Sequence, residues 1–309
     1  MSIATRALSV GSVLLLSLPM NAMGQKPVAA IVEKISGTVM LKQNGKQITL
    51  NPKTDIARRL FAGDSLHCEQ GAKLTLRVGG RFTELDDKSG WFTIPSMIST
   101  HEDPRLRAIE AYGRIGGRSR GPLPLSILYS PMNQSATTPD SFTIRWTPLK
   151  SGCVASFVLE EPSGSRLWDQ TNVDGTLGVL SSDSARQALL NYRSKSSATL
   201  LRLKLVDSCG DSDEATFDLL SVADEQALKT ELAQWDSDAD KLLTHLGRAS
   251  AFSDRRMFFQ AAEEYEAALA LAPDSHDLID STIGAERKAG NLRRAMELEK
   301  RLAAESNAP

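Results

Sequence analysis

Four histidines are the first residues to test for chemistry, because histidine binds metals and moves protons near neutral pH. They are His67, His101, His245 and His276. None belongs to an H-E-x-x-H pattern or to a pair four residues apart, the spacings that place two ligands on one helical face. His67 and Cys68 are neighbours on an expected strand, so their side chains point to opposite faces. We therefore expect no metal site.

Serine and carboxylate groups give no catalytic arrangement either. No G-x-S-x-G elbow occurs beyond residue 24, and Ser165 lies in a polar turn without a neighbouring base. The adjacent carboxylates Asp86-Asp87 and Glu160-Glu161 stand at expected strand ends, whereas glycosidase carboxylates face each other across a cleft. The sequence predicts a protein that is not an enzyme and that uses no cofactor.

An acidic cluster near residue 210 is the remaining candidate for binding an ion. It comprises Asp207, Asp211, Asp213 and Glu214. The cluster resembles a calcium-binding loop but lacks the D-x-D-x-D-G order. We expect a solvated turn, with calcium binding as the alternative.

Three cysteines limit the disulfide chemistry: Cys68, Cys153 and Cys209. An oxidising compartment permits one disulfide and leaves one thiol over. The sequence does not fix the pairing. We favour a bridge between Cys153 and Cys209, because these two fall in the same expected domain.

The first 24 residues have the features of a secretory signal peptide. Arg6 precedes an apolar stretch at 7–20, and Ala22 and Gly24 supply the small residues before a cleavage point. A retained signal anchor is the alternative, but the apolar stretch is short for a membrane span. Since no run of eighteen apolar residues occurs, we expect no integral membrane segment after cleavage.

The charge balance argues against a nucleic-acid partner. The 309 residues include 36 Lys and Arg against 38 Asp and Glu, for a net charge of −2. Removing residues 1–24 removes Arg6 and no acidic residue, so the net charge becomes −2 − 1 = −3. Such a chain carries no basic electrostatic footprint for nucleic acid.

Residues 27–98 show the pattern of a small all-β domain. Polar and apolar residues alternate over 73–78, as in a half-buried strand. Gly79-Gly80 follows and 81–85 alternates again, which predicts a tight hairpin, because glycine accepts the positive φ that such turns need. Asn44-Gly45 marks a second hairpin.

The motifs of this segment resemble a known family. In chain order they are Val32, Ile35-Ser36-Gly37-Thr38-Val39, Leu60, Gly63-Asp64-Ser65-Leu66, Gly71-Ala72-Lys73-Leu74-Thr75-Leu76, Gly79-Gly80 and Leu85. This order is similar to the FecR-type periplasmic domain, whose pattern runs G-x-V, G-D-x-L, G-x-A-x-L-x-L and a glycine turn. The resemblance implies a β domain of the bacterial cell envelope and a periplasmic location. The sigma-factor control of the namesakes is not carried over, because we find no anti-sigma segment or spanning helix before the domain.

Two further segments precede the tail. Residues 99–123 are rich in glycine and arginine and are expected to form a linker, with a basic clamp for an anionic ligand as the alternative. Residues 124–222 return to short alternating strands, which predicts an immunoglobulin-like or fibronectin-like β sandwich. Trp146, at the end of one such strand, is expected in its core.

The spacing of apolar residues becomes helical over 223–305. Phe258, Ala261, Tyr265, Ala268 and Pro273 follow at intervals of three, four, three and five. This resembles the second helix of a tetratricopeptide repeat, and a similar register returns after Gly290, which predicts degenerate repeats over about 242–304. Stacked helical hairpins bind partner proteins. The residues that we expect at the partner surface are Phe258, Tyr265, Arg293 and Arg294.

Together these patterns predict a multi-domain chain with two all-β domains followed by an all-α tail of helical hairpins. Two repeats are few for independent stability, so we expect the tail to pack on the sandwich, on a second copy or on a partner. The favoured function is a non-catalytic cell-envelope adaptor that binds a protein partner through this tail. The alternative is a peptidoglycan or polysaccharide binder that uses aromatic residues of the β domains, Trp91 and Trp168.

Overall fold

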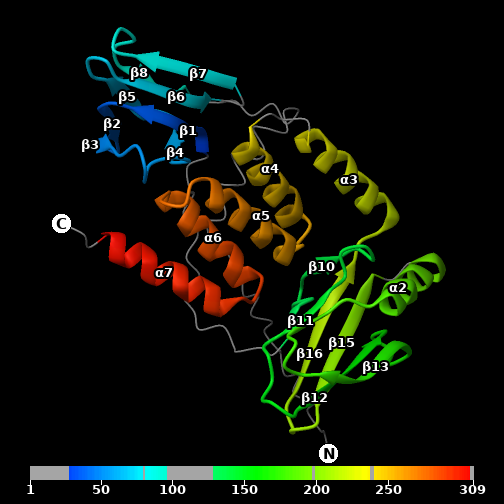
Figure 1. Ribbon diagram of the computed structural model, residues 1–309. Helices are drawn as coiled ribbons and strands as arrows, with labels where there is room; N and C mark the ends of the chain where they lie inside the picture. The colour runs from blue at the N-terminus through cyan, green and yellow to red at the C-terminus, as the bar shows by residue number, and fades with distance from the viewer. Residues whose placement is uncertain (1–27, 79–80, 96–127, 197–198, 237–239, 307–309) are drawn as a thin grey trace, which may run out of the picture.

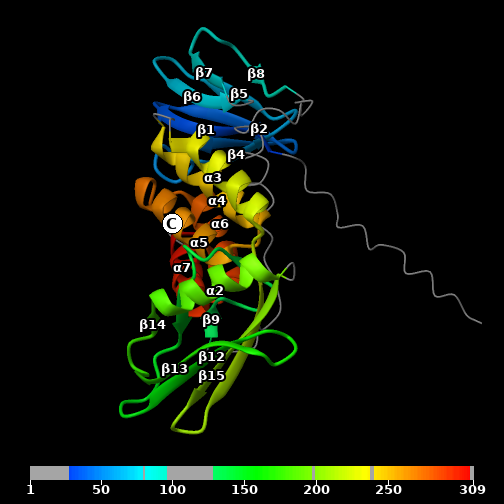
Figure 2. The same ribbon diagram turned by 90° about the vertical axis from the view of Figure 1, so that its right-hand side faces the viewer.

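The computed structural model describes residues 28–78, 81–95, 128–196, 199–236 and 240–306. The expected signal peptide at 1–24 and the expected linker at 99–123 lie outside these ranges. Sheets form the N-terminal two-thirds of the described chain and helices follow, which confirms the order expected from the sequence. Figures 1 and 2 show the N-terminal sheets at one end, the C-terminal helices in the middle and the second group of sheets at the other end.

The N-terminal β region contains two four-stranded sheets, with strand orders β4-β1-β6-β7 and β3-β2-β5-β8. Its strands are β1 (Val28–Ser36), β2 (Val39–Gln43), β3 (Lys46–Leu50), β4 (Arg59–Phe61), β5 (Ser65–Cys68), β6 (Lys73–Val78), β7 (Arg81–Asp86) and β8 (Phe92–Thr93). The expected hairpin of β6 with β7 is confirmed by their antiparallel pairing. Asn44 and Gly45 have φ values of 50° and 76° in the turn between β2 and β3, so this hairpin is confirmed too.

Apolar side chains of both sheets meet in one core, in which Leu41, Leu66 and Leu76 are fully buried. The chain turns sharply between β1 and β2 at Gly37, which has a φ of 78°. A Cβ atom at this position would lie 2.9 Å from Ala72. The turn therefore needs glycine both for its backbone conformation and for its close approach to the neighbouring chain.

The second β region combines a five-stranded sheet, in the order β10-β16-β15-β12-β13, with a three-stranded sheet, in the order β14-β11-β9. Its strands are β9 (Leu128–Ser130), β10 (Ala136–Thr137), β11 (Ile144–Trp146), β12 (Val154–Glu160), β13 (Arg166–Asp174), β14 (Val179–Leu180), β15 (Leu200–Asp207) and β16 (Ser212–Leu219). Trp146 is fully buried between the sheets and its indole Nε1 donates to the Gly175 carbonyl at 2.9 Å. Its expected core position is confirmed.

Helix α2 (Asp183–Lys195) corrects the expectation that this region is all-β. It begins at Ser182, whose side chain accepts a hydrogen bond from the Ala185 amide. Ala185, Leu189 and Tyr192 recur at helical spacing and are buried in the same core as the strands. The helix packs against β13 of the five-stranded sheet.

The cysteines occupy two different environments. A disulfide joins Cys153, before β12, to Cys209, in the turn after β15, with their Cα atoms 5.7 Å apart. It ties together the two chain segments at one end of the neighbouring strands β12 and β15. Cys68 is a buried thiol in the N-terminal core, where burial raises its pKa above the ordinary value.

The C-terminal part is a row of helices: α3 (Val222–Asp236), α4 (Lys241–Asp254), α5 (Phe258–Leu271), α6 (His276–Lys288) and α7 (Leu292–Ser306). The Asp240 and Ser275 side chains cap the first turns of α4 and α6. Gly247 lets α4 approach Trp235 of α3, because a Cβ atom there would lie 2.3 Å from the indole ring. In the described part of the chain, no helix is both long enough and apolar enough to cross a membrane.

Candidate functional site

The helices α4 and α6 begin against the N-terminal β region and form the first junction of the molecule. Strand β1 begins with five consecutive buried residues, Val28–Val32, because the β core covers one face and the helices cover the other. Ile31 belongs to the same apolar cluster as Leu246 of α4 and Leu278 of α6. The helical row and the N-terminal sheets therefore share a core.

A buried arginine lies at the centre of this first junction. The Arg77 side chain of β6 is only 1% exposed. Its Nε donates to Glu33 Oε1 at 2.8 Å, and its Nη2 donates to Asp240 Oδ2 at 2.6 Å. Its guanidinium also lies 4.0 Å from the centre of the Phe82 ring. Arg77 thus joins a strand to the capping residue of α4.

Two carboxyl groups, those of Glu33 and Asp240, bond the same guanidinium at this junction. Burial is the largest cause that raises the pKa of Glu33. The Asp240 carboxylate also raises this pKa and Arg77 lowers it, so that the net pKa is about 7. Within the part of the chain that the structure describes, Arg77 bonds the carboxyl groups of both Glu33 and Asp240, so a proton on Glu33 relieves the repulsion between them. The junction therefore favours the protonated form of Glu33 more than water does.

A second set of bonds lies beside it, at the start of α6. The Arg59 amide donates to Asp277 Oδ2 at 2.6 Å, and the Arg59 guanidinium lies 3.4 Å from Asp280 Oδ2. The Ser275 hydroxyl donates to the Ile56 carbonyl, and the His276 amide donates to the Thr54 carbonyl at 3.1 Å. These bonds fix the helix relative to β4 and the loop before it.

The other ends of the helices meet the second β region and form the second junction. Arg256, before α5, pairs with Asp218 of β16 at 2.5 Å, and its carbonyl accepts from the Ala136 amide at 2.9 Å. The Arg145 guanidinium lies 4.3 Å from the centre of the Phe259 ring. Since both ends of the row are occupied, the helices bridge the two β regions.

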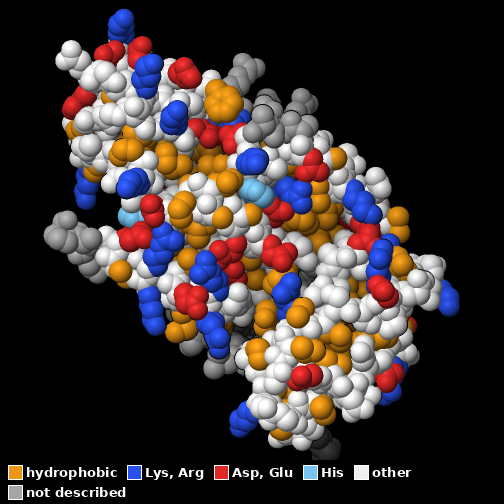
Figure 3. All heavy atoms as spheres, in the orientation of Figure 1, with side chains coloured by type: hydrophobic (Ala, Val, Ile, Leu, Met, Phe, Trp, Pro, Cys, Tyr) orange, Lys and Arg blue, Asp and Glu red, His pale blue; other side chains and the backbone are white. Residues whose placement is uncertain are grey.

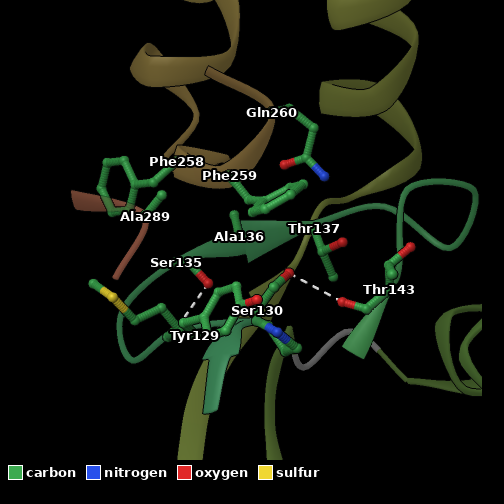
Figure 4. A pocket seen from close by; sticks show the side chains of 12 residues that line it. Tyr129, Ser130, Ser135, Ala136, Thr137, Thr143, Phe258, Phe259, Gln260 and Ala289 are labelled. Atoms are coloured by element: carbon green, nitrogen blue, oxygen red, sulfur yellow. Dashed lines mark hydrogen bonds between the residues drawn. The ribbon is translucent and has the colours of Figure 1, made fainter. Parts of the chain in front are cut away.

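A small cavity lies inside the second junction (Figure 4). Its lining includes Tyr129, Ser130 and Thr143 from the β region and Phe258 and Phe259 from α5. The Ser130 hydroxyl donates to the Thr143 carbonyl at 3.0 Å. The cavity leaves about 10 Å³ for a water-sized molecule, which is room for about one water. It is a packing defect of the junction and is too small for a ligand.

The four residues expected at the partner surface of the tail have different positions. Tyr265 corrects that expectation, because it is fully buried among the helices and cannot contact a partner. Phe258 is half-buried at the second junction, and Arg294 is held by Glu266 at 2.6 and 2.9 Å. Of these four residues, only Arg293 is exposed, on the outer helix α7. The apolar spacing that suggested a binding surface describes the core of the tail.

An open groove of about 740 Å³ runs between α2 and the edge strand β13. This volume lies within the usual range of about 300–1,000 Å³ for ligand sites. Leu167, Trp168, Ala188 and Tyr192 give it an apolar floor. Its polar lining consists of Glu161, Arg166, Ser184, Gln187, Asn191, Lys195 and Ser196.

The two tryptophans considered for a glycan ligand differ in exposure. Trp168 is 8% exposed, and its Nε1 donates to the Ser184 hydroxyl at 2.8 Å, so it is mainly a core residue. Trp91 is 49% exposed beside β8 and stacks on His67, with the ring centres 5.3 Å apart. One face of the Trp91 ring thus has a partner within the protein.

The acidic residues near residue 210 bind backbone amides. Asp207 Oδ1 accepts from the Cys209 and Asp211 amides, both at 2.8 Å, and Asp213 Oδ2 accepts from the Leu128 amide at 2.8 Å. The Asp207 bonds shape the turn between β15 and β16, and the Asp213 bond joins β16 to the start of β9. Among the described residues, no group of three or more His, Cys, Asp or Glu side chains could hold a metal ion.

Comparison with known proteins assigns no family to this arrangement. No family model matches the chain, and no curated protein matches its sequence significantly. Figure 3 shows acidic and basic side chains interspersed over the face of the molecule seen there, without a large field of one sign. The junctions and the groove are therefore the structural features on which the proposed function rests.

Sequence reasoning missed Arg77 and the groove for different reasons. Arg77 alternates with Leu76 as a solvent-facing residue would, and its burial depends on distant helices. The continuous apolar run at the start of β1 was the available signal, because a strand buried on both faces lacks polar alternation. The groove depends on α2, whose exposed face is polar.

Proposed function

We propose that this protein is a non-catalytic adaptor of the cell envelope that presents binding surfaces for a protein partner on one rigid body. The tail acts as the bridge that holds two β domains at a fixed distance and orientation. The bridge places the surfaces of α7, of the groove beside α2 and of the N-terminal sheets in one constant arrangement.

One observation carries this proposal: the helical row is bonded at both ends to a β region. The Arg77 pair with Asp240 is buried at one end, and Arg256 pairs with Asp218 at the other. A free recruiting tail would instead keep its ends in solvent. The shared apolar core around Ile31 further disfavours independent motion of the tail.

The finer assignments belong to the same proposal. Residues 27–98 form a FecR-like β domain, 124–222 an immunoglobulin-like sandwich with an added helix, and 223–305 a tail with tetratricopeptide-like repeats. Export by the signal peptide at 1–24 places the protein in the periplasm. The Cys153–Cys209 disulfide supports this location, because disulfides persist in oxidising compartments.

Site-specific photo-cross-linking in cells tests the adaptor role. A photoreactive side chain replaces exposed residues in turn: Met296 of α7, Gln187 of α2 and Lys46 of β3. We expect a discrete protein adduct from at least one position, identified by mass spectrometry. Adducts to cell-wall material alone, or to no protein from any position, would contradict the proposal.

A glycan-binding role is the second candidate, favoured by the exposure of Trp91. An exposed indole can stack on a sugar ring while Ser65 and Thr93, whose hydroxyls lie 2.9 Å apart on the same sheet, bond its hydroxyl groups. Soluble peptidoglycan fragments would then change the indole fluorescence of the wild type but not that of Trp91→Phe. An equal change in both proteins would exclude Trp91 as the binding residue.

A further inference from the structure

We propose that the groove between α2 and β13 binds an extended acidic peptide segment of a protein partner. This inference rests on the adaptor function and names the chemistry that one of its surfaces recognises. Figures 1 and 2 show α2 and β13 on the side of the second β region that faces away from α7, so a bound segment would not meet the outer helix of the tail.

The edge of β13 supplies one wall of this groove. Strand β13 pairs with β12 on one side, and no other strand of the described chain pairs with its opposite side. Alternate N–H and C=O groups of an edge strand point away from its neighbour and can pair with an added strand. Peptides that bind in this way gain affinity from main-chain hydrogen bonds.

Helix α2 supplies the other wall, with groups suited to a peptide. Gln187 and Asn191 are exposed, and the Gln187 amide donates to Asn191 Oδ1 at 3.2 Å. Side-chain amides both donate and accept, so they can bond a peptide main chain. From Ser184 to Ser196 the wall is about 18 Å long at 1.5 Å per helical residue. On the opposite wall, β13 contributes Arg166, Leu167 and Trp168, so an added strand would pair along about three residues of it.

The charges along the groove select for an acidic segment. Arg166 and Lys195 line it and both are exposed, against the single acidic residue Glu161. Among the described residues, Arg166 has one ion-pair partner, the exposed Asp169 at 3.7 Å, which leaves its guanidinium accessible to a ligand carboxylate. An Asp or Glu side chain of the peptide could pair with Arg166 or Lys195.

The same geometry disfavours a sugar in this groove. Trp168 and Tyr192 are the aromatic residues of the lining, and both are buried, at 8% and 6% exposure. Neither presents an open ring face for stacking. The accessible surface consists of a strand edge, amides and cations, which fits a peptide better.

Selection from a displayed library of random linear peptides, about twelve residues long, tests the proposal on the purified full chain. We expect enriched sequences that carry Asp or Glu and bind as extended segments. The Lys195→Glu and Arg166→Glu variants should each bind the best synthetic peptide about tenfold more weakly. Lys150→Glu, which removes an exposed basic residue of the same β region outside the groove, should leave binding unchanged.

N-methylation of the selected peptide tests the strand pairing itself. Methyl groups on alternate main-chain nitrogens should abolish binding, whereas methyl groups on the intervening nitrogens should be tolerated, because only every second residue bonds the edge of β13. Equal sensitivity at all positions would overturn strand addition.

Equal binding by Lys195→Glu, no enriched peptide, or dimerisation of the chain through this face would overturn the groove assignment. The photo-cross-linking experiment separates this failure from failure of the adaptor function. Protein adducts at Met296 but not at Gln187 would refute the groove and keep the adaptor.

Discussion

The two junctions of the helical row are built in different ways. The first, with the N-terminal sheets, contains a buried arginine that bonds two carboxyl groups and shares an apolar core with β1. The second, with the sandwich, has a smaller apolar cluster that joins Ala136 of β10 to Met257 and Ala261. Its charged contacts are those of Arg256, which is 51% exposed, and of Arg145, which is partly exposed over Phe259. An exposed ion pair contributes little to the free energy of unfolding. Removing one partner of a buried ion pair costs much more, because the other charge is left buried without a partner. The comparison predicts that the ion pairs of the first junction contribute more to stability than those of the second.

The largest effect should come from removing the central cation of the first junction. Arg77→Met removes the guanidinium that bonds the carboxyl groups of Glu33 and Asp240 inside the protein. We expect a loss of about 3–5 kcal/mol in the free energy of unfolding, measured by urea denaturation. The loss should be smaller at acid pH, where Glu33 is protonated. An unchanged free energy of unfolding would show that the Arg77 bonds do not stabilise the protein.

The second-largest effect is expected within the sandwich, and it tests whether the two β regions unfold separately. Replacing Cys153 and Cys209 by serine opens a loop between residues 56 apart in sequence. We expect a loss of about 2–4 kcal/mol, because the unfolded chain gains entropy. The unfolding transition of the sandwich should move while that of the N-terminal region stays, as monitored by Trp91 fluorescence. A uniform shift of both would mean that the junctions couple the two regions completely.

A pH dependence should distinguish the first junction from the second. The pKa of Glu33 is raised to about 7 in the folded protein, so its stabilising contribution is complete below about pH 4.5 and is lost as the pH rises through about 7. We expect Glu33→Gln to flatten the stability profile between these limits by about 1–3 kcal/mol. Glu286 is buried among the helices and its pKa is also raised to about 7. The variant Glu286→Gln therefore serves as a comparison for the same substitution away from the first junction. If only Glu286→Gln flattened the profile, the first junction would not be the pH-sensitive element.

The smallest effect is expected at the second junction. Arg256→Ala removes an exposed pair with Asp218 and should change the free energy of unfolding by less than about 1 kcal/mol. The same change should broaden the distribution of distances between spin labels placed on α7 and β13. An unaltered distribution would show that the aromatic packing around Phe259 holds the junction without the ion pair.

Local patterns predicted most of the elements. Alternation over Lys73–Val78, the Asn44-Gly45 turn and the helical spacing after residue 222 are properties of neighbouring residues, and the structure contains the corresponding strands and helices. Helix α2 escaped prediction because only Ala185, Leu189 and Tyr192 form its apolar stripe between polar residues. Tyr265 was misread because helical spacing alone does not distinguish a core stripe from a binding stripe.

The sequence by itself determined the order of sheets and helices, the hairpin turns and the burial of Trp146, since these follow from residue type and short-range spacing. Only the tertiary structure decided that the tail joins both β regions, that Arg77 is buried and that α2 forms a groove with β13. Each of these depends on contacts between residues far apart in the chain, such as Arg77 with Asp240 and Arg256 with Asp218. Long-range contacts leave no periodic signal, because the partner that buries a side chain lies outside any local window of sequence.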